Sequence, residues 1–189
     1  MSVSTEFPAW GPWLWPAAAI VGTALHLLLS RRPRTGLRIL EVFLLWWFGW
    51  GVGVTALIAF YANGFLSDPM ATRIGFPTGN PFQWEVASAN LAVCVAGFLC
   101  LRYRDRFWEA TTVVATVYLW GAAVGHIRQY VQFGNNHPYN TGPILWTDIF
   151  VQVVLIAALI IYRRMQHASA VRATATAATE NVAVPVSDA

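Results

Sequence analysis

Charge is scarce in this chain. Of its 189 residues only 11% are charged, whereas 57% are hydrophobic, and the mean hydropathy is +0.49. Soluble domains carry about 25% charged and about 45–50% apolar residues, so a soluble core of this size could not hide so much apolar surface. The composition therefore excludes a soluble enzyme, a disordered protein and a disulfide scaffold, and it indicates a polytopic membrane protein.

Lysine is absent and cysteine is rare. All 12 basic residues are arginine, and because a retinal pigment or another Schiff-base mechanism needs a lysine amine, retinal is excluded as a cofactor. The two cysteines, Cys94 and Cys100, lie six residues apart in one apolar stretch and on different helix faces. We expect no disulfide between them.

Five apolar stretches have the length of about 20 residues that a helix needs to cross a bilayer. They comprise residues 10–29, 39–61, 84–101, 107–131 and 143–162. The sequence therefore predicts an all-α fold, a bundle of five transmembrane helices that forms one membrane-embedded domain over residues 1–165. Residues 166–189 are rich in Ala, Thr and Val and lose the strongly apolar pattern, so we expect a disordered cytoplasmic tail there. A short helix around residues 67–74, capped by Ser67 or Asp68, is expected in the loop after the second span.

The arginines indicate the orientation of the bundle. Ten of the 12 fall on one side if the five spans alternate, and the connecting segments of the opposite side, 62–83 and 132–142, contain only Arg73. By the positive-inside rule we expect the N-terminus outside the cell and the C-terminus in the cytoplasm. The protein is then a multi-pass protein of the cell membrane. The same arginines favour anionic lipids at the cytoplasmic face, which accounts for a pI of about 9.2 without nucleic acid as a partner.

Three ionisable side chains from three spans are expected at a similar depth in the outer half of the bilayer. Glu85 opens the third span, His126 lies in the last turns of the fourth, and Asp148 lies one to two turns into the fifth. Charged groups inside hydrocarbon are costly, so each is a functional candidate. We assign these three as candidate catalytic residues of an outward-facing polar site. The polar neighbours expected to bind a ligand there are Asn90, Arg128, Gln129, Asn140 and Gln152.

Three kinds of chemistry could use this site. His126, Glu85 and Asp148 could hold a metal ion such as zinc or iron. A desolvated carboxylate beside a histidine could perform acid–base chemistry on an apolar substrate. Protons or ions could also pass along such a chain, although only His26 and Glu41 lie near the cytoplasmic side.

Two further interpretations of these polar residues depend on their geometry: a structural role and haem binding. In a purely structural alternative, Arg128 pairs with Glu85 or Asp148, and the polar cluster only fixes the order of the helices. A b-type haem is not expected, because His26 and His126 lie near opposite surfaces and cannot supply two axial ligands at one depth.

Four short motifs follow one another along the chain in an order that resembles a known family. They are Phe82 to Leu91 (FQWEVASANL), Gly125-His126, Asn140-Thr141-Gly142 and Trp146 to Ile149 (WTDI). This order resembles a family of small bacterial integral membrane proteins that is classified only as a domain of unknown function. The resemblance covers about residues 40–162 and leaves out the first span and the tail. It implies that Glu85, Asn90, His126, Asn140, Gly142 and Asp148 belong to a shared pattern, and it leaves the reaction open.

Three functional hypotheses follow, and whether the protein is an enzyme stays open among them. The leading one is binding, or binding and conversion, of a small lipid-soluble molecule or metal ion at Glu85, His126 and Asp148. The alternative is a non-enzymatic accessory or assembly subunit that contacts a membrane-protein partner or a second copy of itself. The third is a proton-coupled transporter, against which the lack of an inverted repeat counts.

Overall fold

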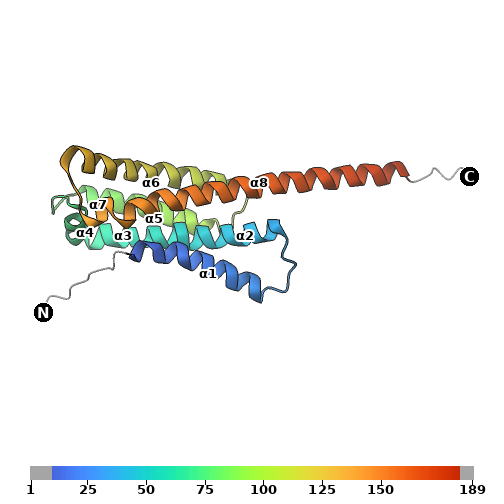
Figure 1. The fold of residues 1–189 in the computed structure, drawn as a ribbon, viewed down its shortest axis with the longest axis horizontal. Coiled ribbons are helices and arrows are strands. Elements are labelled where there is room, and N and C mark those ends of the chain that lie inside the picture. Colours follow the sequence, from blue (N-terminus) through green and yellow to red (C-terminus); the bar gives the residue numbers. More distant parts are fainter. Residues whose placement is uncertain (1–9, 184–189) are drawn as a thin grey trace, which may run out of the picture.

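The computed structural model describes residues 10–183, and in this range the chain folds into helices joined by short loops (Figure 1). Five helical segments are long and apolar enough to cross a membrane, and they are Gly11–Leu29, Gly36–Phe65, Phe82–Leu99, Arg106–Phe133 and Pro138–Thr179. Each overlaps one of the five expected stretches. The prediction of an all-α fold with five helices of membrane-spanning length is confirmed.

The helices follow one another along the chain in a simple order. The first span comprises the 3-10 turn η1 (Gly11–Trp13) and α1 (Leu14–Leu29). The second comprises α2 (Gly36–Trp46), a π-helical segment η2 (Trp47–Val54) and α3 (Thr55–Phe65). The short α4 (Ser67–Ile74) leads to α5 (Phe82–Leu99), then come α6 (Arg106–Phe133), the single turn α7 (Pro138–Thr141) and α8 (Pro143–Ala183).

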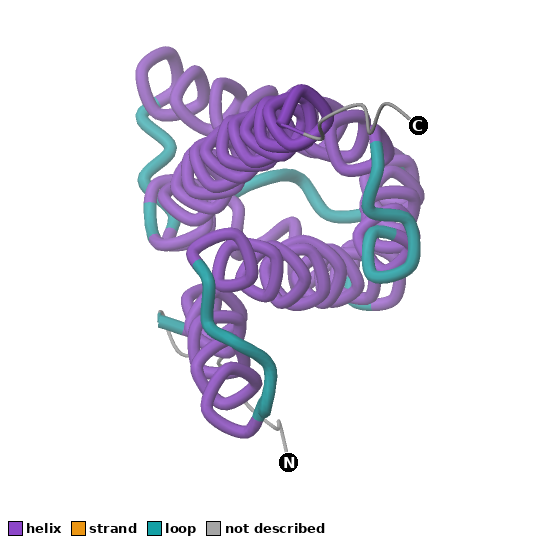
Figure 2. The backbone as a smooth tube through the Cα atoms, turned by 90° about the vertical axis from the view of Figure 1, so that its right-hand side faces the viewer, coloured by secondary structure: helices purple, strands orange, loops and turns teal. Residues whose placement is uncertain are grey.

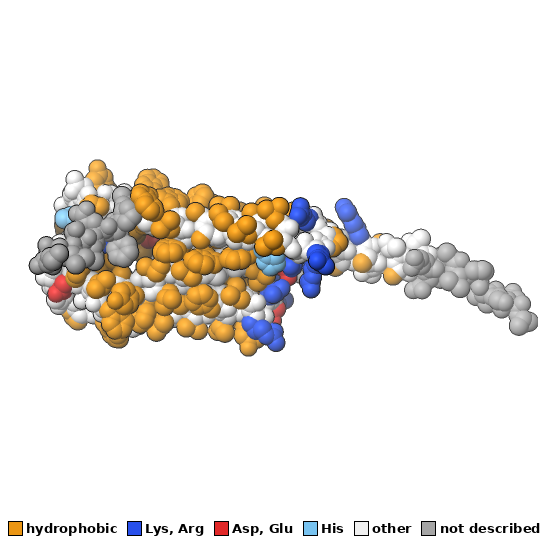
Figure 3. Space-filling model, turned by 90° about the horizontal axis from the view of Figure 1, so that it is seen from below, with side chains coloured by type: hydrophobic (Ala, Val, Ile, Leu, Met, Phe, Trp, Pro, Cys, Tyr) orange, Lys and Arg blue, Asp and Glu red, His pale blue; other side chains and the backbone are white. Residues whose placement is uncertain are grey.

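Two helix pairs and one peripheral helix make up the bundle. The second span packs on α5 through α3 and η2, and α6 packs on α8. The first span lies on the outside, where α1 contacts α2 and η2 (Figure 2). One end of the bundle carries α4 and α7, and we call it the loop end. Arginine side chains gather at the opposite end, from which α8 continues, and we call it the arginine end (Figure 3).

Glycine allows the second and third spans to approach each other closely. A Cβ atom added at Gly97 of α5 would lie 2.8 Å from the backbone nitrogen of Gly53 and 3.0 Å from the carbonyl oxygen of Phe48. Both neighbours are backbone atoms of η2, which cannot rotate away. Gly53 of η2 and Gly97 of α5 therefore allow close packing of these two helices.

Tryptophan side chains in the core donate hydrogen bonds to backbone carbonyls. The Nε1 of Trp47 donates to the oxygen of Val151 at 3.1 Å, and that of Trp108 donates to the oxygen of Cys100 at 2.8 Å. Both rings are at most 1% exposed. Their apolar bodies pack in the core, and their single polar group is satisfied without solvent.

The C-terminal region differs from the expectation. α8 continues without interruption to Ala183, so residues 166–183 form a helix where the sequence predicts a disordered tail (Figure 1). Alanine has the highest helix propensity, and neither glycine nor proline interrupts the sequence between Pro143 and Ala183. The rest of the predicted tail, residues 184–189, lies outside the described residues.

The predicted short helix after the second span is confirmed as α4, but its cap is not. The residue before the helix is Leu66, which forms no side-chain cap. Asp68 instead accepts a hydrogen bond from the backbone of Gly79 at 2.7 Å and so ties the loop back onto the helix. Gly75 ends α4 in the left-handed conformation with a φ of 84°.

We expect Gly97→Ala to lower the free energy of unfolding by about 1–3 kcal/mol, because the new methyl group must push the backbone of η2 away. The matched control is Gly121→Ala in α6, where an added Cβ meets nothing within 4 Å. That substitution should be neutral or stabilising by up to about 1 kcal/mol. Thermal unfolding of both variants in the same detergent checks the difference, and equal effects would contradict the close approach.

Candidate functional site

His126 and Asn140 are the two predicted site residues that the structure joins directly. The Nδ1 atom of His126 lies 2.9 Å from the Oδ1 atom of Asn140. The amide nitrogen of Asn140 donates to the carbonyl oxygens of His126 and Asn135, at 3.2 and 2.7 Å. Asn140 is fully buried. Its side chain thus ties the turn α7 to the end of α6, and we call this pair the latch.

The latch determines which ring nitrogen of His126 carries the hydrogen. Because the Asn140 amide nitrogen already donates to two carbonyls, Oδ1 is the atom that faces the imidazole, and Nδ1 must be the donor. The Nε2 atom is then an acceptor in the neutral ring, and it has no hydrogen-bond partner among the side chains described, those of residues 10–179.

The loop between α6 and α7 is also held in place by an amide side chain. Asn135 donates from Nδ2 to the carbonyl oxygen of Ile74 at 2.9 Å, and its Oδ1 accepts the backbone hydrogen of His137 at 3.2 Å. These bonds connect the end of α4 to the segment before α7. A Cβ at Gly142 would overlap the carbonyl oxygen of Pro138, so only glycine fits between α7 and α8. The loop end is therefore held by side-chain amides and tight turns.

A second group of polar side chains lies deeper, between α5, α6 and α8, and we call it the interior cluster. Its members are Asn90 of α5, Thr116 and Tyr118 of α6, and Asp148 and Gln152 of α8. The Nδ2 of Asn90 donates to the hydroxyl of Tyr118 at 2.7 Å. The hydroxyl of Thr116 donates to the Oε1 of Gln152 at 3.2 Å. The Asp148 carboxyl is close enough to Tyr118 to act on it electrostatically.

Two polar groups of the interior cluster lack partners. The Nε2 atom of Gln152 is buried and donates to no acceptor in the described part of the chain, and the residue itself is 0% exposed. The carboxyl group of Asp148, one helical turn earlier, forms neither a hydrogen bond nor an ion pair with the side chains described, those of residues 10–179. A buried donor without a partner costs about 1–3 kcal/mol, so the Gln152 amide calls for an explanation. The half-buried Asp148 carboxyl lies on the same helix face.

The other predicted site residues stand apart from both groups. Glu85 lies exposed on the first turn of α5, and Gln129 is half-buried and forms no side-chain hydrogen bond within the described part of the chain. Arg128 is exposed and donates to Gln132 at 2.9 Å. Within residues 10–183 no ion pair joins it to Glu85 or Asp148, so the clamp in the structural alternative does not form.

The expected three-ligand metal site also needs correction. Nowhere in the described range do three His, Cys, Asp or Glu side chains come together in a way that could hold a metal ion, and this includes Glu85, His126 and Asp148. Equal depth along three helices does not place side chains on facing surfaces. Glu85 points outward, whereas Asn90, five residues later on the same helix, points into the bundle.

Sequence reasoning missed Tyr118 and Thr116. Both belong to a helix with a mostly apolar and aromatic sequence, in which threonine and tyrosine are commonly interpreted as residues that only pack. The available signal was weak, namely that Thr116 and Ala123 mark the buried face of α6 and that Tyr118 precedes His126 by two turns. Only the neighbouring helices show that these hydroxyls meet Gln152 and Asn90.

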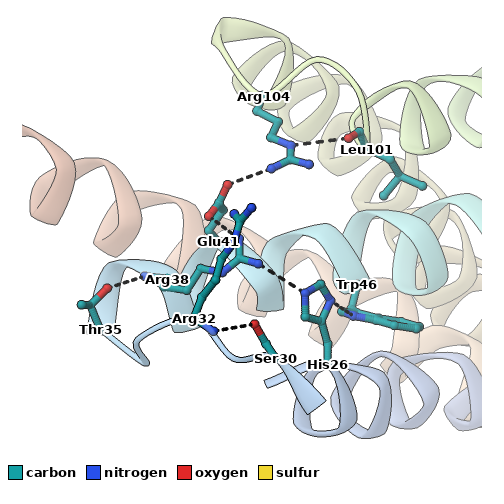
Figure 4. A network of polar contacts seen from close by, with 9 residues as sticks. All are labelled: His26, Ser30, Arg32, Thr35, Arg38, Glu41, Trp46, Leu101 and Arg104. Atoms are coloured by element: carbon teal, nitrogen blue, oxygen red, sulfur yellow. Dashed lines mark hydrogen bonds and ion pairs between the residues drawn. The ribbon is translucent and has the colours of Figure 1, made fainter. Parts of the chain in front are cut away.

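A separate polar network lies at the arginine end, where side chains of α1, α2 and the loop after α5 meet (Figure 4). Glu41 forms ion pairs of 2.8 Å with both Arg38 and Arg104. His26 is half-buried and lies 3.3 Å from both a guanidinium nitrogen of Arg38 and the indole nitrogen of Trp46.

We expect Asn140→Ala to lower the free energy of unfolding by about 1–3 kcal/mol, since it leaves polar groups of His126 and Asn135 without partners. Asn136→Ala is the matched control, because that neighbour is exposed and should change stability by less than about 0.5 kcal/mol. Thermal unfolding in detergent measures both. If the two variants unfold alike, the latch does not stabilise the loop end.

Comparison with known families places the chain. Residues 9–168 match the sequence profile of a group described as a family of unknown function, DUF6790. The match extends the resemblance noted above to the first span and ends where α8 leaves the bundle. Comparisons with curated proteins and with solved structures give no significant match. Because the profile covers most of its length, this chain is a member of the DUF6790 family.

Proposed function

We propose that this protein binds a small lipid-soluble molecule in the interior cluster. The observation that carries the proposal is the pair of unpartnered groups on α8, the Nε2 of Gln152 and the carboxyl of Asp148. Inside hydrocarbon no water replaces a missing partner, so an unsatisfied donor and an unpaired carboxyl there are costly. A bound ligand would satisfy both.

The two groups restrict the chemistry of the ligand. The Gln152 amide nitrogen can only donate, so it requires an acceptor such as a carbonyl oxygen. A carboxyl group on the same face, one turn away, can accept a hydrogen bond from a hydroxyl. The ligand class is therefore a compact apolar molecule that carries a carbonyl and a hydroxyl a few ångströms apart.

The other members of the cluster position these two groups. Thr116 donates to Gln152 Oε1 and so turns its Nε2 toward the unpaired side. The hydroxyl of Tyr118 is fixed by Asn90 and donates to the carbonyl oxygen of Val86 at 3.3 Å. Asn90 lies eight residues into α5, about 12 Å from the loop end at 1.5 Å per residue. Access from the loop end, next to the latch, is the shorter route.

We also infer the orientation from the charge distribution. Ten of 12 arginines lie in or next to the segments at the arginine end (Figure 3). The positive-inside rule then places that end, with the extension of α8, in the cytoplasm, and it places the loop end outside a cell membrane. The ligand site is nearer the outer surface in this arrangement.

A second candidate function, an accessory or assembly subunit, is favoured by the extension of α8. This helix continues 21 residues beyond Tyr162, about 30 Å, and most of that length is exposed. Most helical stability in proteins comes from packing and not from propensity, so a partner protein would stabilise this exposed extension. Proton-coupled transport has less support, because fully buried apolar side chains such as Phe48, Trp108 and Leu155 lie between the interior cluster and the arginine end.

Asp148→Leu and Gln152→Leu are each expected to abolish ligand retention, because each removes one of the two polar groups that would recognise the ligand. Protein extracted gently from its own membranes is examined by native mass spectrometry, where the wild type should carry an additional mass of a few hundred daltons. The matched control, Glu85→Gln, removes a carboxylate at the same end and should keep that mass. A bare wild-type chain, or variants that retain the ligand, would exclude the proposal.

The orientation predicts which cysteine variants a membrane-impermeant thiol reagent labels in intact cells. Thr78→Cys, in the exposed loop before α5, should be labelled, and Ser169→Cys, on the exposed extension of α8, should not. The two native cysteines are buried and contribute little background. If only Ser169→Cys is labelled, the orientation in the membrane is the reverse of the one inferred.

A further inference from the structure

A lipid-facing groove lies between α1 and α5 at the arginine end, separate from the interior cluster. Its volume is about 360 Å³, and it runs over the π-helical segment of the second span. Rings and aliphatic chains line it, including Trp46, Trp50, Phe98 and Leu101, with Gly49 at its floor and His26 at one end. Phe98 and Leu101 are about 40% exposed, so the groove opens to the surface that lipid tails contact.

The groove exists because of the backbone of the second span. A π-helical turn adds a residue to the helix and displaces the side chains around it, and such turns are frequent at functional sites. Gly49 contributes no side chain there, and an added Cβ would meet only Leu101, at 3.5 Å. On the other side, the ring of Trp46 lies against Gly22 of α1, which has no Cβ to displace it.

Hydrogen-bond donors outnumber acceptors at the end of the groove where His26 lies (Figure 4). The Arg38 guanidinium approaches the Nε2 of His26, and the Trp46 indole approaches its Nδ1, each at 3.3 Å. Arginine and tryptophan only donate, and a neutral imidazole accepts at one nitrogen only. Therefore only one of the two contacts can be a hydrogen bond, and the second ring nitrogen presents a hydrogen to another donor.

A further donor at the same place lacks a partner. The Nε atom of Arg38 is buried and pairs with no acceptor in the described part of the chain. The nearby carboxylate does not supply one, because the two oxygens of Glu41 are engaged by Nη1 of Arg38 and Nη1 of Arg104. Two guanidinium groups and one carboxylate leave a net positive charge. An anionic group with several acceptor oxygens would satisfy these donors.

We propose that the groove binds one anionic membrane phospholipid, with its phosphodiester at Arg38, His26 and Trp46 and one acyl chain along Gly49 and Trp50. Charge and position support this occupant together. Arginine and tryptophan side chains at this level face the headgroup region, and the apolar groove continues from there into the bundle. The site is independent of the ligand proposed for the interior cluster.

The experiment is a lipid titration of the purified full-length chain, followed by native mass spectrometry. The probes are phosphatidylglycerol and phosphatidylcholine with identical acyl chains, so that only the headgroup differs. We expect the wild type to retain one phosphatidylglycerol with at least a fivefold preference. Arg38→Gln should reduce this preference to less than twofold. Arg128→Gln, which removes the same charge at the loop end, should leave it unchanged.

A second variant keeps the test decisive if Arg38→Gln fails to fold. Gly49→Leu places a side chain in the groove and should reduce retention of phosphatidylglycerol at least fivefold, while the helix content stays that of the wild type. The proposal is overturned if the wild type shows no headgroup preference, or if Arg128→Gln weakens binding as much as Arg38→Gln does. It is also overturned if inorganic phosphate alone displaces the lipid, or if a second copy of the chain occupies the groove.

Discussion

Within apolar surroundings every polar group must find its partner inside the protein, and this constraint organises the whole molecule. The helices satisfy their own backbones. The tryptophans of the core donate to carbonyls of neighbouring segments, as Trp47 does to Val151 across more than 100 residues of sequence. Asn140 satisfies three polar groups at once. In the described part of the chain, buried side-chain donors without a partner occur at Gln152 and Arg38, and the Asp148 carboxyl also forms no hydrogen bond there.

The unpartnered groups of the interior cluster differ in chemistry from those at the arginine end. The interior cluster offers one amide donor and one carboxyl, which suits a small neutral molecule. The arginine end offers several donors and a positive charge, which suits an anion. Close packing of η2 on α5 through Gly53 and Gly97 lies between them and keeps the core apolar. The two proposed sites thus differ in chemistry and are separated by apolar packing.

The candidate site was only partly predictable. Asn90, His126, Asn140, Asp148 and Gln152 were all named as site residues from their depth and type, and each is buried or half-buried. Depth follows from residue number along a helix, so it can be estimated from sequence. The rotation of each helix about its axis depends on which neighbour it packs against. For this reason Glu85 lies at the expected level and yet on the outer surface, while Tyr118, which sequence reasoning passed over, meets Asn90.

The sequence by itself determined the five membrane-length helices, the arginine-rich end and the family, because these depend on composition and on order along the chain. The alanine-rich sequence after the last span also favours a helix, and α8 continues there past the bundle where a disordered tail was predicted. Only the tertiary structure decided the pairing of His126 with Asn140, the double ion pair of Glu41 and the groove over Gly49. Each joins segments distant in the chain, whose meeting depends on how helices pack and turn against one another.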